Sequence, residues 1–241
     1  MLRRNRFFIM AFAIVVLPSL LGFRVLSAKD TASDQRERAR NAATVLSEIM
    51  EIPEGGIPNE LMSRAEAVAV IPHLMKGAFG VGGEYGKGLV SHRLDNGHWS
   101  APSFIKIGGG SFGLQLGVEA TDLVLVFTDR QGFKGLLEGK VKLGVDAAAA
   151  AGPVGRDAQA SMDVMLKSPI LAYSRSKGLF AGIALDGAVV SIDDSGNLRA
   201  YGKDLSAQEI MYDGKARIND TVAPFVRTLE KYAPPRKRIT D

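Results

Sequence analysis

The stretch IGGGSFGLQLG, residues 107–117, constrains the fold of this chain more than any other segment. It satisfies the G-x-G-x-x-G pattern of dinucleotide sites and, through Ser111, the G-x-S-x-G pattern of hydrolases. Both patterns require a helix directly after the glycines. Here Phe112, Leu114 and Leu116 alternate with Gly and Gln instead, which is the period of a β-strand. The sequence predicts a glycine-faced strand that packs closely on the fold or admits a ligand.

Three further segments also have the pattern of strands. Residues 123–127, LVLVF, are continuously apolar, which predicts a central strand covered on both faces. Residues 141–145, VKLGV, alternate strictly and place Lys140 and Lys142 on the face opposite the apolar side chains. An Asn-Gly pair within residues 83–107 favours a tight turn between two paired antiparallel strands.

Helices are expected on both sides of these strands in the chain. Residues 34–51 have apolar residues at three- and four-residue spacing, which predicts an amphipathic helix docked on the core. Shorter helices are expected from Pro58, from a capping box at Ser206 and from Pro224. We therefore expect the α+β class: one domain with an antiparallel, barrel-like β-sheet core flanked by helices.

A faint internal repeat accompanies this pattern. Lys76 begins KGAF and is followed by LVS at residues 89–91, while Lys177 begins KGLF and is followed by VVS at residues 189–191. Residues 193–196, like the earlier Asn-Gly pair, have the composition of a hairpin turn. The repeat predicts two related antiparallel units in one sheet system.

The two ends of the chain differ from its middle. Residues 1–28 begin with MLRRNR, continue uncharged through residues 7–23 and end in a small Ser-Ala pair, an order typical of a secretory signal. An uncleaved anchor through residues 7–23 stays open as the alternative. Residues 29–232 would then be the folded domain and residues 233–241 a basic tail. Export predicts a location in the periplasm or the cell envelope.

Charge and composition exclude several classes of function. Removing residues 1–28 takes four arginines and no acidic residue, so the net charge falls from +4 to zero. A neutral domain gives no support to nucleic-acid binding, which needs a basic surface. The chain has no cysteine, and its three histidines lack the spacing of a metal pair. We expect no metal and no cofactor; a hydrolase using Ser111 is a minor alternative because no histidine partner is indicated.

One basic segment has the chemistry of a phosphate site. In AYSRSKGLF, Arg175 and Lys177 are two residues apart on a predicted strand, so both side chains point the same way. Arginine offers a fork of donors, lysine a point charge, and the neighbouring serines further donors for a phosphate. The alternative is that both cations pair with acidic residues such as Asp146 or Asp186.

Five long blocks in the same order resemble the SYLF lipid-binding domain, the Ysc84-type actin-binding domain. The blocks are VLSEIMEIPEGGIPNELMSRAEAVAVIP, FGVGGEYGKGLVSHR, WSAPSFIKIGGGSFGLQLGVEATDLVLVF, KVKLGVDAAAAAGPVGR and AYSRSKGLFAGIALDGAVV. The resemblance covers roughly residues 35–210. It implies a single α+β domain that binds phospholipid head groups without enzymatic activity. This sequence departs from the eukaryotic members in carrying an export signal and no SH3 or FYVE module, so we expect an exported, bacterial-type member.

We therefore expect the chain to bind anionic phospholipid of the cell envelope through a local basic patch. The predicted head-group contacts are Arg175, Lys177, Lys76, Lys140 and Lys142. An envelope structural or protein-interaction module, with a protein partner and no lipid specificity, is the alternative. Actin is not an expected partner of an exported chain.

Overall fold

The computed structural model describes residues 32–53, 56–79, 81–111, 117–154, 168–176, 179–183, 185 and 187–235. The helices are α1 (Ala32–Met50), α2 (Asn59–Arg64), α3 (Arg130–Leu137), α5 (Asp194–Tyr201), α6 (Ala207–Met211) and α7 (Ala223–Tyr232). The strands are β1 (Ala67–Phe79), β2 (Val81–His92), β3 (Ser103–Ser111), β4 (Gly117–Phe127), β5 (Lys140–Lys142), β6 (Ala149–Ala151), β7 (Ile170–Ser176), β8 (Leu179–Gly182) and β9 (Val189–Ile192). The predicted signal, residues 1–28, lies outside the described residues.

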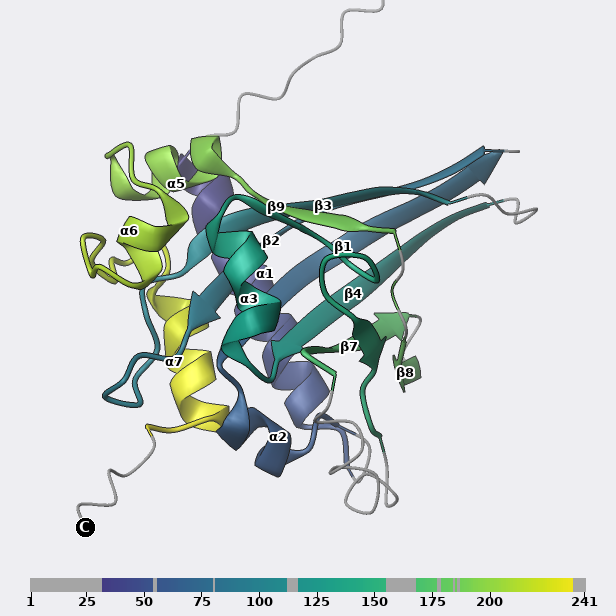
Figure 1. Cartoon of the computed structure of the whole chain (residues 1–241), viewed down its shortest axis with the longest axis horizontal. Coiled ribbons are helices and arrows are strands. Elements are labelled where there is room, and N and C mark those ends of the chain that lie inside the picture. The colour runs from purple at the N-terminus through teal and green to yellow at the C-terminus, as the bar shows by residue number, and fades with distance from the viewer. Residues whose placement is uncertain are drawn as a thin grey trace, which may run out of the picture.

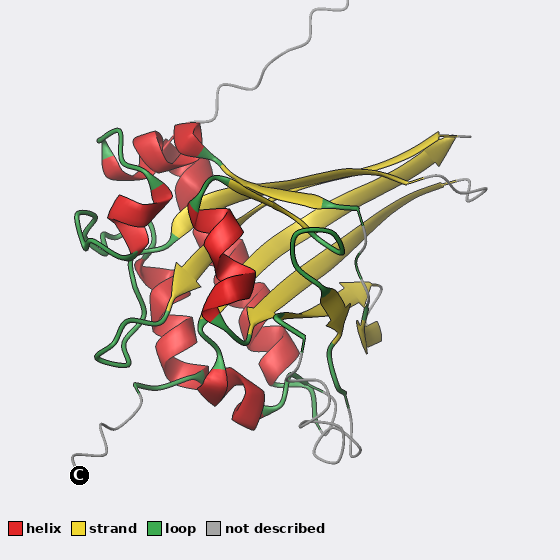
Figure 2. Ribbon diagram, in the orientation of Figure 1, coloured by secondary structure: helices red, strands yellow, loops and turns green. Residues whose placement is uncertain are grey.

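One curled sheet holds all of the described strands together (Figures 1 and 2). Its order is β5-β9-β3-β2-β1-β4-β7-β6, with β8 also paired to β7. Every pairing is antiparallel except that of β6 with β7. The edge strands β5 and β6 are joined by residues 143–148 alone, within which Leu143 and Ala147 form a bridge, so the sheet curls towards closure. The predicted α+β class with a barrel-like antiparallel sheet is confirmed.

The two faces of the sheet bury two separate hydrophobic clusters. The inner face carries apolar side chains from β5 through to β6, and α3 and α6 complete this cluster. The outer face packs β1 to β4 and β7 against α1, α2 and α7. Figure 1 shows α1 and α3 on opposite sides of the strands.

The most apolar strand separates the two clusters, as the sequence predicts. In β4, residues 123–127 are fully buried; Val124 and Val126 belong to the outer cluster and their neighbours to the inner one. The predicted amphipathic helix is α1, whose buried side chains include Leu46 and Ile49. The predicted capping box at Ser206 begins α6, and Pro224 lies in the first turn of α7.

The internal repeat does not correspond to two equivalent units. Its first copy lies in the neighbouring strands β1 and β2, but β8 pairs with β7 while β9 lies between β5 and β3. The turn expected at residues 193–196 is instead the start of α5, where the Asp193 side chain accepts from the Gly196 N–H. The prediction of a second hairpin was wrong because the same short motif serves a different pairing.

Strands β1 to β4 are the longest in the sheet and extend beyond the helices (Figure 1). We call residues 75–77, 83–86, 107–109 and 119–120 of this extension the projecting end. No helix within the described residues is long and apolar enough to cross a membrane.

Candidate functional site

The predicted residues Lys140 and Arg175 lie on the outer face of the sheet. Strand alternation decides the face: Lys140 is opposite in direction to the buried Val141 of the inner cluster, and Arg175 is two residues from Tyr173 of the outer cluster. Six strand-to-strand steps separate the two cations, about 29 Å along the curved sheet. The two cations are therefore not neighbours in the strand order.

Two lysines that the sequence analysis did not select fill the interval. Lys140 is paired in register with Ser191 of β9, which is in turn the partner of Lys106 on β3. Lys106 is the direct register partner of Lys87 on β2. Because paired residues share a face, these lysines follow one line across the outer face. We call Lys140, Lys106, Lys87 and Arg175 the basic row.

A bulge in β1 interrupts the basic row. Between Ile71 and Leu74, β1 has one residue more than its partner on β4. His73 lies in this bulge at φ 52°, and its backbone N–H donates to the Asp122 Oδ1 atom at 3.0 Å. The bulge is therefore held by Asp122, the same carboxylate that binds Arg175, the next cation of the row.

Arg175 is held by two carboxylates. Its Nη2 atom lies 2.7 Å from Asp122 Oδ2 and 2.5 Å from Glu48 Oε2, and its Nε atom donates to Asp122 at 3.2 Å. Burial opposes the charge of Arg175, but the hydrogen bonds that it donates to Asp122 and Glu48 outweigh this effect and raise its pKa. The expectation that the cation has acidic partners is met by these two residues. Asp146 instead accepts from the Lys142 backbone N–H.

Helix α1 lies along the other half of the basic row. Arg38 of α1 is 8% exposed and its Nη1 atom is 2.9 Å from Asp193 Oδ2, while Lys106 Nζ is 3.2 Å from Oδ1 of the same carboxylate. Burial opposes the charge of Asp193, but hydrogen bonds from Arg38 and Lys106 lower its pKa to about 2. This ion triad fixes the beginning of α1 and of α5 to β3.

A shallow hollow opens where α1 passes the bulge. It has a volume of about 260 Å³. Its walls come from both elements: Asp34, Glu37, Arg38 and Asn41 of α1, and Pro72, His73 and Lys87 of the sheet. Since both signs of charge line it, the hollow favours no simple anion by itself.

The remaining predicted residues have different positions. Lys142 is exposed on β5, one outer-face position beyond Lys140, in register with Val189. Lys76 is on the inner face with Leu74, 3.9 Å from Glu84 and in register with Glu119. The structure therefore does not bring Lys76 to the basic row. Lys177 lies outside the described residues.

The glycine strand is confirmed as a strand as far as it is described. Residues 108–111 all belong to β3, so the chain is still a strand, and not a helix, directly after Gly108. A Cβ on Gly109 would lie 3.2 Å from Ala188 Cα, whereas one on Gly108 would meet nothing nearer than 3.7 Å. Gly109 therefore allows close packing, whereas Gly108 leaves the outer face of the strand uncovered by a side chain.

The three histidines have separate surroundings. His92 is buried and stacked between Phe133 and Tyr212, and desolvation lowers its pKa. His98 is exposed and 3.1 Å from Glu230, while His73 is in the bulge. The side chain of Ser111 lies outside the described residues.

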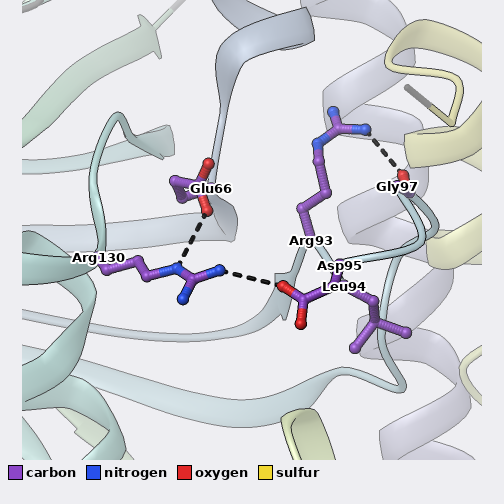
Figure 3. Close-up of a pocket in the computed structure, with 6 residues that line it drawn as sticks. All are labelled: Glu66, Arg93, Leu94, Asp95, Gly97 and Arg130. Atoms are coloured by element: carbon purple, nitrogen blue, oxygen red, sulfur yellow. Dashed lines mark hydrogen bonds and ion pairs between the residues drawn. The ribbon is translucent and has the colours of Figure 1, made fainter. Parts of the chain in front are cut away.

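A second hollow, of about 160 Å³, lies at the opposite end of β2 (Figure 3). Arg93 lines it and donates to the carbonyl oxygens of Ala65, Met62, Gly97, Ala233 and Pro234. Arg130 lies 3.1 Å from Asp95 and 3.9 Å from Glu66. These cations bind the protein's own oxygen atoms, so the residues of this hollow have a structural role.

Lys87 and Lys106 carried a signal that the sequence analysis missed. Each alternates with apolar or glycine residues within its strand, as Lys140 and Lys142 do. Alternation assigns a side chain to a face, but only the register across the four strands β5, β9, β3 and β2 shows that Lys140, Lys106 and Lys87 share a line.

Comparison with known proteins confirms the resemblance to the SYLF domain. Residues 108–232 match the Ysc84 family, described as "Las17-binding protein actin regulator". LAS seventeen-binding protein 3 of Saccharomyces cerevisiae is 35% identical over 180 residues, which cover 73% of this chain and 39% of the relative. SH3 domain-containing YSC84-like protein 1 of Homo sapiens is 31% identical over 191 residues, 77% of this chain and 56% of the relative. The chain thus spans well under two thirds of these relatives.

Proposed function

This chain belongs to the Ysc84 family, and from that premise we propose that it is a non-enzymatic module that binds the anionic head groups of phospholipid membranes. The basic row carries this proposal. Lys140, Lys106 and Lys87 share the outer face with Arg175, and Lys142 lies beside them. A line of cations suits a charged surface better than a single small ligand.

The expected attraction is modest and depends on salt. A basic residue near an anionic bilayer contributes about 1 kcal/mol, so four such residues give weak binding. Surface charges are screened beyond about 8 Å at physiological ionic strength. Lys106 also pairs with Asp193, and Arg175 pairs with Asp122 and Glu48. These ion pairs reduce what the two cations contribute to membrane attraction.

Charge reversal in matched pairs tests the proposal. We expect Lys87→Glu with Lys140→Glu to weaken co-sedimentation with anionic vesicles at least tenfold. The control is Lys134→Glu with Lys203→Glu, which changes the net charge equally at exposed positions outside the row. Equal losses in both double variants would show that binding follows net charge and not the basic row.

We also propose that residues 1–28 direct export and that the membrane is one of the cell envelope. The arginine-rich start, the uncharged run at residues 7–23 and the small residues after it support this. Mass spectrometry of the protein from fractionated cells tests it. A mature N-terminus near residue 29 in the envelope fraction is expected; an intact chain in the cytoplasm would contradict it.

A protein-binding function is the second candidate. The family description names an actin regulator and Las17 binding, and the chain shares this domain with those relatives. That description gives no support to our expectation that actin is excluded, which stays a prediction. Co-sedimentation with actin filaments tests it directly. Stoichiometric binding to filaments together with indifference to vesicles would favour the protein-binding function over the lipid one.

The absence of enzymatic activity is part of the same proposal. Ser111 is the residue that a hydrolase would use as nucleophile, through its G-x-S-x-G pattern. A serine-directed fluorophosphonate probe is expected to leave the protein unlabelled. Labelling that is lost in Ser111→Ala would contradict the proposal.

A further inference from the structure

Next to the basic row, the outer face carries a second line of paired residues with different chemistry. Tyr85 on β2 is in register with Met75 on β1 and with Gly108 on β3. Met75 continues the line to Ala120 on β4. Tyr85 is 52% exposed and Met75 45%, so two large side chains lie side by side in solvent. We call Gly108, Tyr85, Met75 and Ala120 the apolar row.

The strand surface around the apolar row is flat. Gly83 is two residues beyond Tyr85 on the same face, and a Cβ there would meet nothing nearer than 3.6 Å. Gly108 is similarly open. The two exposed side chains therefore stand out from a surface with little side-chain relief, on the projecting end beyond the helices (Figure 1).

The opposite face of the same projecting end has the wrong charge for an anionic membrane. There Lys76 is flanked in register by Glu84 on β2 and by Glu119 on β4. Two carboxylates and one cation disfavour contact with anionic lipid, whereas the outer-face positions next to the apolar row hold Lys87 and Lys106 with the single carboxylate of Asp122. The charge pattern thus selects the outer face.

The two rows lie close enough together to contact one bilayer interface at the same time. Neighbouring outer-face positions on a strand are two residues, or about 7 Å, apart. With the outer face turned to the bilayer, the cations of the basic row would reach the lipid phosphates while the exposed Tyr85 and Met75 side chains enter the interface, where apolar groups lie at ~5–10 Å depth. A tyrosine suits this depth because its ring is apolar and its hydroxyl polar.

We propose that the outer face of the projecting end is the membrane-docking surface, with Tyr85 and Met75 inserted into the bilayer interface and the basic row at the phosphates. This inference rests on the proposed function and adds to it an orientation and two apolar anchors. The insertion also supplies attraction that a neutral domain with partly paired cations lacks.

The absence of cysteine from the chain makes this orientation measurable. Single variants Tyr85→Cys, Met75→Cys and Ile218→Cys of the full chain each carry an environment-sensitive fluorophore. Ile218 is 47% exposed, matching Met75, in the segment between α6 and α7. These two helices lie at the far end from the projecting strands (Figure 1). Anionic vesicles with nitroxide groups on their acyl chains should quench the labels at positions 75 and 85 but not the label at position 218.

Each result bears on the inference separately from the proposed function. Vesicle binding without quenching at positions 75 and 85 would overturn the inference and leave lipid binding intact. No binding to any vesicle would overturn both the inference and the proposed function. If a cross-linker attached at position 85 captured a protein instead, the apolar row would belong to a protein-binding surface and the inference would be overturned. In a second measurement, Tyr85→Ser with Met75→Ser should weaken vesicle binding about tenfold, whereas Ile218→Ser should leave it unchanged.

Discussion

At the scale of single residues, Asp193 has the most clearly defined electrostatic role. It begins α5 and receives charged donors from α1 and β3 through Arg38 and Lys106, with 1% of its side chain exposed. Its pKa of about 2 is below the ~3.9 of an unfolded aspartate, so its contribution to stability is complete above pH ~4 and is lost as the pH falls towards 2. This shift corresponds to about 2.5 kcal/mol.

Asp193→Asn tests that role. We expect the variant to lose about 3 kcal/mol of unfolding free energy at pH 7, because Arg38 is left buried without its carboxylate. The difference from the wild type should shrink between pH 4 and pH 2 in urea titrations, and the exposed Asp204→Asn should show neither effect. A difference that stays constant down to pH 2 would contradict the assigned pKa.

At the scale of elements, α1 limits how much of the basic row is available. Its Glu48 contributes one of the two carboxylates on Arg175. Glu48→Gln should therefore raise the affinity for anionic vesicles about fivefold at low salt, since one more cation is worth about 1 kcal/mol. Glu51→Gln removes the same charge from the end of α1, where Glu51 pairs with Lys231. Equal gains in both variants would mean that Arg175 has no special part in binding.

The glycines of β2 make a second prediction about elements. A Cβ on Gly88 would overlap the carbonyl oxygen of Val70 and lie 2.9 Å from Ile71 Cα, whereas Gly83 is open. Gly88→Ala should cost about 3 kcal/mol in chemical unfolding, from overpacking against backbone. Gly83→Ala should change the unfolding free energy by less than about 0.5 kcal/mol. Similar losses at both positions would contradict the assigned packing.

Several elements were predictable because their pattern is local. The apolar run at residues 123–127 and the capping box at Ser206 each specify an element from neighbouring residues alone. The bulge at His73 was not predicted, since it is defined by the partner strand and by the Asp122 carboxylate. The internal repeat misled for the same reason: short motifs do not specify which strands pair.

At the scale of the whole molecule, the candidate site depends on sheet order. Alternation predicted that Lys140 and Lys142 share a face, but Lys87 and Lys106 join them only through β9 and β3. Lys76 is close to Lys87 in the sequence yet faces the other way, because the bulge shifts β1 by one residue. Non-local pairing of this kind has no signature in a single sequence.

The central claim is that charge on one face of the sheet brings the molecule to anionic membranes. The most direct test is co-sedimentation of the purified chain with anionic and with zwitterionic vesicles across a range of salt concentrations. We predict stronger binding to anionic vesicles at low salt, with the excess disappearing as screening increases. Equal binding to both kinds of vesicle at every salt concentration, or binding to neither, would contradict the claim.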